Sequence, residues 1–359
     1  MLNICALEHG LAYGLDREID RESATSEVVC RTMAKRHPPS VATLDSPLVS
    51  SALPIAPSKV VFARHETFHP RFGWLKKGFD AASADPEVFL REDAPLSLGV
   101  GKNMVKSIRY WCAAFKILED DRPAPGVPTD LLKDSGWDPY LEDPASLWLL
   151  HWFLLKPPCL ATLWAFCFYE LMGTEFTPES LLHDLQDYRD RIAPRIADSS
   201  LRKDISCFLR MYAKQPLKGK GRGSAEEALD CPFSDLGLIQ TIGPGVLETG
   251  NRRYRFVMGQ KFSLPAEIIV YTALDYASTQ ANQMGSIPLT KVLFDPYSPG
   301  LALKLTEMAL IEAISQVSRQ IPKIRLEDLA GRMTLAYDSP PRTLAYQVLS
   351  QYYSASVPL

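Results

Sequence analysis

The sequence lacks the features that mark a secreted protein, a membrane protein or a cysteine-ligated zinc protein. Its seven cysteines are odd in number and scattered, and no CxxC pair occurs, which argues against a disulfide framework and a cysteine-based zinc site. Residues 1–22 lack the basic segment and long apolar core of a signal peptide. The most apolar stretch, residues 145–172, is interrupted by His151 and by Lys156-Pro157-Pro158, which leaves each half too short to cross a bilayer. These absences indicate a cytoplasmic protein with no membrane partner.

An excess of positive charge is also absent. The formal net charge is −3 and charged residues make up 23% of the chain, so binding to nucleic acid has to depend on a local basic patch. The hydrophobic content of 46% is ordinary for a globular protein, and 359 residues are enough for two or three domains. No repeat of fixed period is evident, and the composition leaves the oligomeric state open.

The patterns along the chain predict a mainly α fold with small β-hairpins, built from helix-turn-helix and winged-helix modules. Residues 1–58, which become rich in Pro and Ser, show neither a helical nor an alternating period and are expected to form a mobile leader or linker. Residues 59–175 are expected to form an N-terminal helical domain with a helix-turn-helix. Residues 176–262 are expected to form a winged-helix-like module, and residues 263–359 a C-terminal helical domain.

The most unusual chemistry is concentrated in residues 62–118. We expect a short strand at 59–65, a helix at 70–83 with Phe72, Leu75 and Phe79 on one face, and a short helix at 86–93. A turn at 96–101 and a longer helix at 102–118 follow. Helix, short helix, turn and longer helix is the order of a helix-turn-helix unit.

The longer helix is expected to have one apolar and one basic face. The apolar face repeats with 4-3-4-3 spacing and comprises Met104, Ile108, Trp111, Phe115 and Leu118. The opposite face carries only cations, which are Lys102, Lys106, Arg109 and Lys116. A solvated face usually mixes the two signs, so the uniform sign favours contact with DNA phosphates over simple solvation. Both interpretations remain open.

Residues 65–69, HETFH, match the H-E-x-x-H pattern of zinc metalloproteases, which requires both histidines on one face of a helix. Pro70 follows the second histidine and disfavours a helix there, so we reject the zinc protease hypothesis. Off a helix, the same groups suit phosphodiester cleavage, which needs an activated water and charge stabilisation on the phosphate. The alternative is a structural polar network. The candidate catalytic residues are His65, Glu66 and His69.

The remainder of the chain reads mostly as helices. Asp143-Pro144 is expected to start the first of two buried helices, at 145–155 and 159–173, and His151 is expected to be a hydrogen-bonded core residue. Helices at 179–193 and 201–214 precede a basic loop and two strands within residues 236–259 around a Gly-rich turn, which suggests a winged helix or a plain hairpin with solubilising arginines. Beyond Pro265, helices are expected at 266–280, 299–320 and 343–353, with a short one at 326–332.

Several long segments resemble a bacterial family that carries a domain of unknown function and is similar to SspB. They are RHETFHPRFGWLKKGFD, DAPLSLGVGKNMVKSIRYWCAAFKI, DPYLEDPASLWLLHWFLL, and PFSDLGLIQ with RYRF. The resemblance extends from about residue 60 to the end of the chain. It implies the DNA-nicking component of a single-stranded DNA phosphorothioation defence module against phage. It also implies two partners, a PAPS-reductase-like sulfur-transfer protein and an ATPase, and it assigns no catalytic residue.

The leading hypothesis is DNA binding with strand nicking that depends on a divalent metal, magnesium or manganese. The alternatives are a non-catalytic DNA-binding subunit that presents DNA to a sulfur-transfer partner, and a helix-turn-helix regulator. The metal ligands and the DNA motif stay open. The candidate DNA-contacting residues are Arg64, Arg71, Lys76, Lys77, Lys102, Asn103, Lys106, Arg109, Lys116, Lys218, Lys220, Arg222, Arg252, Arg253 and Arg255.

Overall fold

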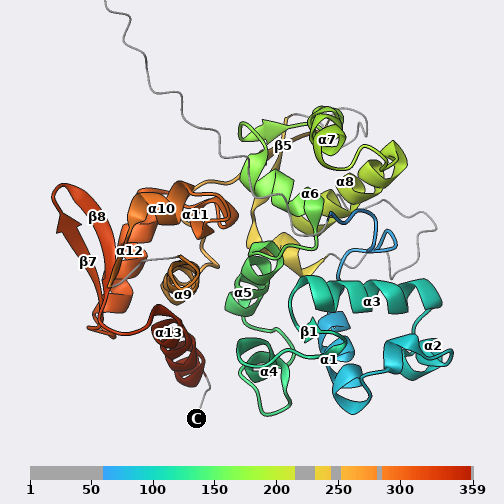
Figure 1. The fold of residues 1–359 in the computed structure, drawn as a ribbon, viewed down its shortest axis with the longest axis horizontal. Helices are drawn as coiled ribbons and strands as arrows, with labels where there is room; N and C mark the ends of the chain where they lie inside the picture. Colours follow the sequence, from blue (N-terminus) through green and yellow to red (C-terminus); the bar gives the residue numbers. More distant parts are fainter. Residues whose placement is uncertain (1–59, 215–230, 244–251, 281–284, 357–359) are drawn as a thin grey trace, which may run out of the picture. The chain divides into compact units, whose positions relative to one another are not determined.

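The structure is a computed structural model that describes residues 60–214, 231–243, 252–280 and 285–356. Helices dominate these residues, and their strands form small antiparallel sheets (Figure 1). The expected mainly α fold with small β-hairpins is therefore confirmed. All described residues belong to the compact unit Ser51–Leu359. The boundaries expected near residues 175 and 262 stay predictions, and the leader of residues 1–58 lies outside the described ranges.

The first part of the described chain is a cluster of helices packed around α3. Its elements are α1 (Trp74–Ala84), η1 (Val88–Leu90), α2 (Ala94–Leu98), α3 (Lys102–Ala114), β1 (Leu118–Glu119), β2 (Arg122–Pro123) and α4 (Val127–Leu132). Helix α1 approaches α3 closely at Gly78, where an added Cβ would lie 2.4 Å from the Cys112 Sγ atom. Gly99, with a φ of 62°, ends α2 in the left-handed region that glycine adopts without steric cost.

Several local predictions for this part were wrong. Residues 60–70 form no strand, because Ala63, Glu66 and Thr67 all have positive φ angles. The helix expected at 102–118 ends at Ala114, and Lys116 turns away with a φ of 57°. The short helix expected at 86–93 is a single 3-10 turn, and α2 occupies part of the expected turn. Phe72 is exposed, although Leu75 and Phe79 are buried as expected.

A nearly all-apolar helix lies at the centre of the core. The central elements are α5 (Pro144–Leu155), α6 (Thr162–Ala165) and the π-helical η2 (Phe166–Glu170). The Asp143 side chain accepts a hydrogen bond from the Ala145 amide and caps α5, as expected. His151 is fully buried and is hydrogen-bonded to the Tyr212 hydroxyl and the Ala302 carbonyl. Within the described ranges, every helix is too short or too polar to cross a membrane.

The next part contains two helices and a three-stranded sheet. Its elements are β3 (Glu175–Phe176), α7 (Pro178–Ile192), α8 (Asp198–Tyr212), η4 (Pro232–Leu236), β4 (Ile239–Ile242) and β5 (Arg253–Phe256). Thr177 and Ser180 form a capping box at the start of α7. Strands β4 and β5 pair antiparallel with Gln240 opposite Arg255, which confirms the two strands expected within residues 236–259. The turn at residues 244–251 lies outside the described part.

The last part contains a second three-stranded sheet, which the sequence did not predict. Its elements are α9 (Ala266–Ala277), β6 (Ser286–Pro288), α10 (Leu289–Phe294), α11 (Pro299–Ala302), α12 (Glu307–Ser318), β7 (Ile324–Leu329), β8 (Arg332–Tyr337) and α13 (Pro341–Ser356). Ala330 and Gly331 both have positive φ angles and join β7 to β8 in a tight turn, so the short helix expected at 326–332 is absent. The helix expected at 299–320 breaks at Lys304, and Thr306 caps α12.

The two three-stranded sheets share one topology. In the first, β3 precedes α7 and α8, and the β4–β5 hairpin follows. In the second, β6 precedes α10, α11 and α12, and the β7–β8 hairpin follows. The last strand of each set lies in the middle of its sheet, in the orders β3-β5-β4 and β6-β8-β7. The order of strand, helices and hairpin therefore occurs twice with the same strand pairing, although the number of helices differs, and α8 and α12 are each the last α-helix before the hairpin.

Candidate nucleic-acid interface

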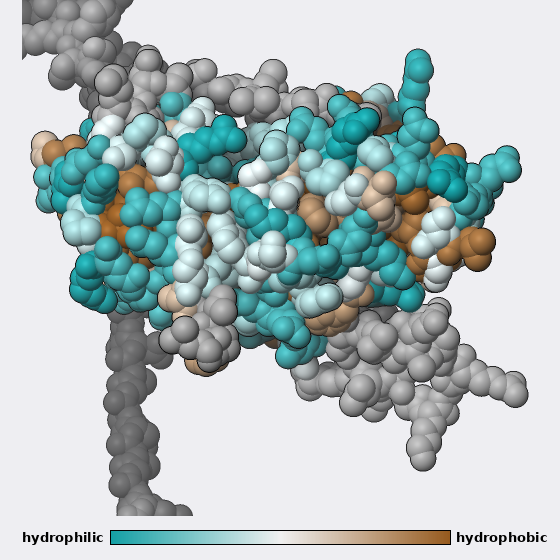
Figure 2. All heavy atoms as spheres, turned by 90° about the horizontal axis from the view of Figure 1, so that it is seen from below, coloured by the Kyte–Doolittle hydropathy of each residue, from teal (hydrophilic) through white to brown (hydrophobic). Residues whose placement is uncertain are grey.

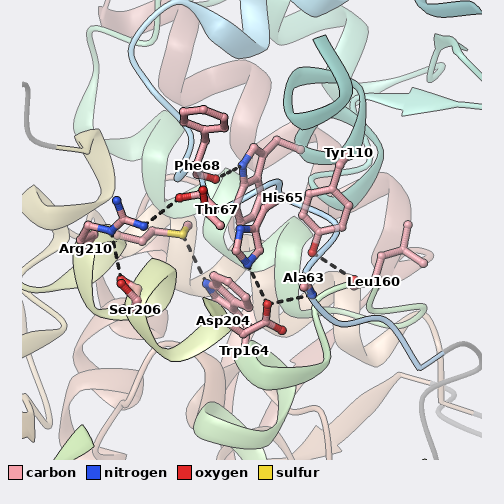
Figure 3. A network of polar contacts seen from close by, with 12 residues as sticks. Ala63, His65, Thr67, Phe68, Tyr110, Leu160, Trp164, Asp204, Ser206 and Arg210 are labelled. Carbon is pink, nitrogen blue, oxygen red and sulfur yellow. Dashed lines mark hydrogen bonds and ion pairs between the residues drawn. The ribbon is translucent and has the colours of Figure 1, made fainter. Parts of the chain in front are cut away.

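Residues 61–70, which we call the strap, connect several helices that are far apart in the sequence. The buried His65 ring is hydrogen-bonded through Nε2 to Asp204 Oδ1 on α8, at 2.7 Å (Figure 3). The Ala63 amide donates to the same carboxylate oxygen at 2.8 Å. The Trp111 indole on α3 donates to the Phe68 carbonyl at 3.0 Å. The strap is thus fixed to α8 on one side and to α3 on the other.

The outer side of the strap brings together cations from both helices. The Lys106 Nζ atom on α3 lies 3.7 Å from the Glu66 carboxylate. The Arg210 guanidinium on α8 donates to the Thr67 carbonyl at 2.7 Å (Figure 3). Consecutive strap residues therefore contact a basic residue of α3 and a basic residue of α8. Non-glycine residues with positive φ are often retained at functional sites, and Glu66 and Thr67 are two of them.

The structure separates the three candidate catalytic residues by environment. His65 is buried, with its ring stacked on Trp111 at 6.0 Å between centroids. Burial raises the pKa of its partner Asp204, although the hydrogen bonds from His65 and Ala63 oppose that shift. Glu66 is partly exposed at the surface, and His69 is half-buried. Of the three, Glu66 is the group best placed to meet a ligand from solvent.

The described residues contain no group of three His, Cys, Asp or Glu side chains that is arranged to hold a metal ion. Two surface cavities, of about 470 and 410 Å³, also lie away from the strap. The larger is lined by residues such as Phe79, Arg122 and Lys133, and the smaller by residues such as Phe72, Tyr140 and Leu236. Neither of these two cavities is lined by a residue of the strap.

Four of the candidate DNA-contacting cations are bonded within the protein. The buried Lys76 ammonium binds Asp80 and Asp134, whose hydrogen bonds outweigh the effect of burial and raise its pKa. Lys77 donates to the Leu98 carbonyl. Arg109 on α3 forms a two-point ion pair with Asp121. Lys116, just after α3, donates to the Phe153 carbonyl, and burial lowers its pKa to about 8. These bonds within the protein indicate that the four side chains mainly stabilise the fold.

The other candidate DNA-contacting residues differ in their exposure and in their contacts within the protein. Arg64, Lys102 and Asn103 are exposed and have no polar partner among the described residues. Arg71 stacks on the Phe68 and Trp74 rings. In the hairpin, Arg253 pairs with Glu175, Arg255 contacts Gln240, and Arg252 also has an interaction. Lys218, Lys220 and Arg222 lie outside the described residues. The assignment of all these residues to DNA stays a prediction.

Helix α8 carries a basic stripe that the sequence does not reveal. Its outward side, which we call the α8 stripe, consists of Ser199, Arg202, Lys203, Ser206 and Arg210. The first four are exposed and Arg210 is partly exposed. The spacing alone is visible in the sequence, but Asp204 interrupts the run of cations. Asp204 points inward to His65, so the outward stripe carries no acid. Only the burial of Asp204 shows that the exposed charges of α8 after Asp198, at its first turn, are all cations.

One face of the molecule is mainly hydrophilic, with hydrophobic residues in separate patches (Figure 2). Exposed large apolar residues occur, for example Leu96, Met172 and Phe262. Scattered apolar residues are normal for a folded surface and do not by themselves mark a site.

Comparisons with known proteins agree on one relationship. The family described as a protein of unknown function, DUF4007, matches residues 62–353. An SspB crystal structure shares 36% sequence identity and a TM-score of 0.73, with 84% of this chain and 90% of that chain covered. A magnesium ion-bound SspB crystal structure shares 37% identity and a TM-score of 0.74, with the same coverage. No curated protein matches the sequence.

Proposed function

Because the chain belongs to the DUF4007 family and is similar to SspB, we propose that it is a DNA-binding, strand-nicking protein of a bacterial DNA phosphorothioation defence module. The strap supports this proposal: Lys106 of α3 and Arg210 of α8 both reach it, at Glu66 and Thr67. A surface with cations from two helices attracts the phosphates of DNA, even though the whole chain has a net charge of −3.

The topology around α8 supports a winged-helix module. A strand, two helices and a hairpin follow one another, and the last strand lies between the other two. In DNA-binding modules of the helix-turn-helix class, the second helix of the pair enters the major groove. Here that second helix is α8. Helices α2 and α3, separated by a turn with Gly99 and Gly101, offer a second helix-turn-helix of the kind expected from the sequence.

Strand nicking needs a group that activates water and positive charge that stabilises the phosphate. Glu66 is the carboxylate that lies among the cations at the strap, so we assign the reaction centre to it. His65 positions the strap through Asp204 instead of contacting DNA. His69, half-buried on the same segment, stays a catalytic candidate.

A divalent metal, magnesium or manganese, would supply charge stabilisation and an activated water for nicking. Magnesium at nucleic-acid sites is commonly held by one or two carboxylates together with phosphates and waters. The described residues offer no cluster of three metal-ligating side chains. We therefore assign no metal ligands, and we propose only that Glu66 faces the DNA.

The second candidate function is a non-catalytic DNA-binding subunit, and the burial of His65 favours it. In that case the strap only aligns the two helices, and the protein presents DNA to its partners. Both functions place the protein in the cytoplasm, where it would work with a PAPS-reductase-like sulfur-transfer protein and an ATPase. A regulator of transcription would instead prefer one operator sequence over others.

A plasmid-nicking assay decides between the two functions. We expect the wild-type protein to convert supercoiled plasmid to open circles in magnesium or manganese. Glu66→Gln should slow nicking at least 100-fold while its DNA affinity stays within about threefold of wild type. Glu179→Gln, which changes an exposed carboxylate on α7, serves as the matched control and should nick normally. Protein that binds DNA but leaves the plasmid supercoiled under every metal would rule out the enzyme and leave the presenting subunit.

A further inference from the structure

We propose that the α8 stripe is a binding site for duplex DNA and that it guides the duplex toward Glu66. The inference rests on the DNA-binding function proposed above. It adds the position of the binding site, on α8, and the form of the DNA, which is duplex. The stripe consists of two hydroxyl residues and three cations, which are Ser199, Arg202, Lys203, Ser206 and Arg210.

The two sides of α8 are chemically distinct. The inward side packs Leu201, Ile205 and Phe208 into the core. Asp204 also faces inward and is held by His65 and Ala63. These contacts fix the rotation of the helix about its axis, so the stripe faces solvent in one defined orientation. A fixed orientation lowers the entropy that is lost when the helix binds a ligand.

The dimensions of the stripe suit the major groove. With a rise of 1.5 Å per residue, the eight steps from Arg202 to Arg210 span about 12 Å of helix. The major groove is about 12 Å wide and admits an α-helix. The small side chains of Ser199 and Ser206 leave room for a close approach to phosphate or base edges. Arginine can contact guanine or phosphate at two points, and Lys203 adds a further cation.

The uniform charge of the stripe is not a general property of this surface. Helix α7, which packs on α8, carries exposed acids on its outer side, namely Glu179, Asp184, Asp187 and Asp190. Asp198, at the start of α8, is engaged by Gln186 and Arg189 of α7. A merely solvated surface usually mixes both signs on each helix. On α7 the exposed acids outnumber the cations, with Arg191 as an exposed exception, whereas after Asp198 the exposed charges of α8 are all cations.

The second copy of the topology gives an internal comparison. Helix α12 holds the place that α8 holds in the first copy, yet its exposed side carries Glu307, Met308, Glu312 and Gln316. Residues 306–318 contain no Lys or Arg at all. Since the same topology folds with acids at the equivalent helix, the cations of α8 are not needed to build the module. They are better explained by a ligand with negative charge.

The stripe is also continuous with the proposed reaction centre. Arg210, at its C-terminal end, contacts the Thr67 carbonyl next to Glu66 (Figure 3). Across Glu66 lies Lys106 of α3. A duplex held along α8 would therefore have its backbone close to the strap. Duplex DNA fits this geometry better than a single strand, since single-strand sites rely on exposed aromatic rings for stacking, and the stripe has none.

The test is a fluorescence anisotropy titration of a labelled 20-base-pair duplex and of its separate strands. Arg202→Ala/Lys203→Ala should weaken duplex binding at least tenfold and should reduce the dependence of log K on log salt by about two. Both side chains are exposed, so the thermal unfolding midpoint should not change. Glu307→Ala/Glu312→Ala on α12 is the matched control and should leave duplex affinity within twofold of wild type.

A third variant separates this inference from the proposed function. Lys102→Glu/Lys106→Glu changes the α3 side of the strap and leaves α8 intact. If this variant loses duplex binding while Arg202→Ala/Lys203→Ala binds as wild type, the α8 site is refuted and the DNA-binding function stands. Equal losses for the duplex and the single strands would refute the preference for duplex. If wild-type protein binds neither form of DNA, the proposed function itself fails.

Discussion

Pro70 largely decides how the residues before it fold. The sequence correctly rejects a zinc-binding helix at residues 65–69 because proline disfavours a helix there, and the structure has a turn at that position. The sequence does not reveal the partner of His65, since Asp204 lies 139 residues away on another helix. Nothing local to either residue specifies this pair. It arises from tertiary packing, which also turns a suspected catalytic histidine inward.

His151 gives a prediction at the same scale. Burial lowers its pKa to about 3 from 6.5, helped by the nearby Lys261 and Lys304 and opposed by the hydrogen bond to the Ala302 carbonyl. Between these two pH values the unfolded chain binds a proton and the folded protein does not, so stability is full above pH 6.5 and falls as the pH is lowered. We expect a loss of about 2 kcal/mol in the free energy of unfolding between pH 6.5 and pH 5.

Urea unfolding at several pH values measures this loss. His151→Gln removes the titrating group and should show a flatter dependence on pH over the same window, although its stability at pH 7.5 should be lower. Other groups, such as the buried Asp204, contribute equally to both proteins and cancel in the difference. Parallel pH profiles for the two proteins would contradict the assignment.

At the scale of elements, helices with strong apolar periodicity were predicted well, and strands with weak alternation were not. The apolar stripe of α3 buries Ile108, Trp111 and Phe115 as expected, because its period requires a single buried face. The β7–β8 hairpin was missed, since its alternating pattern is short and its turn, Ala330-Gly331, resembles a helix end in the sequence. The α8 stripe was missed for another reason: the buried Asp204 interrupts it in the sequence but not on the surface.

The packing of α1 on α3 yields a prediction about Gly78. An added Cβ would lie 2.4 Å from the Cys112 Sγ atom and 2.9 Å from the Ile108 Cγ2 atom, both in the core. Gly78→Ala should therefore destabilise the protein by about 1–3 kcal/mol through overpacking, despite the higher helix propensity of alanine. Gly101→Ala, where no heavy atom lies within 4 Å and φ is −67°, should be tolerated. Thermal unfolding of both variants checks this, and equal midpoints would show that α1 and α3 can move apart freely.

At the scale of the molecule, neither the net charge nor the sequence pattern reveals the distribution of charge among the helices or the repeated topology. The net charge of −3 hides a local separation of charge: acids predominate among the exposed charged residues of α7 and α12, and cations predominate among those of α3 and α8. The repeated topology leaves no repeat of fixed period in the sequence, because it depends on strand pairing between distant segments. Composition and periodicity predicted the mainly α fold, but they did not predict which helices would share a surface.

This separation of charge predicts how DNA affinity depends on salt. Counterion release gives a slope of log K against log salt of about −0.9 for each phosphate contacted. The cations of the two helices that are exposed or reach the strap are Lys102, Lys106, Arg202, Lys203 and Arg210. If all of them contact phosphate, the slope is about −4.5, and Lys102→Glu/Lys106→Glu should reduce it to about −2.7. A slope near zero, or one that this variant leaves unchanged, would mean that α3 and α8 do not act as one surface on DNA.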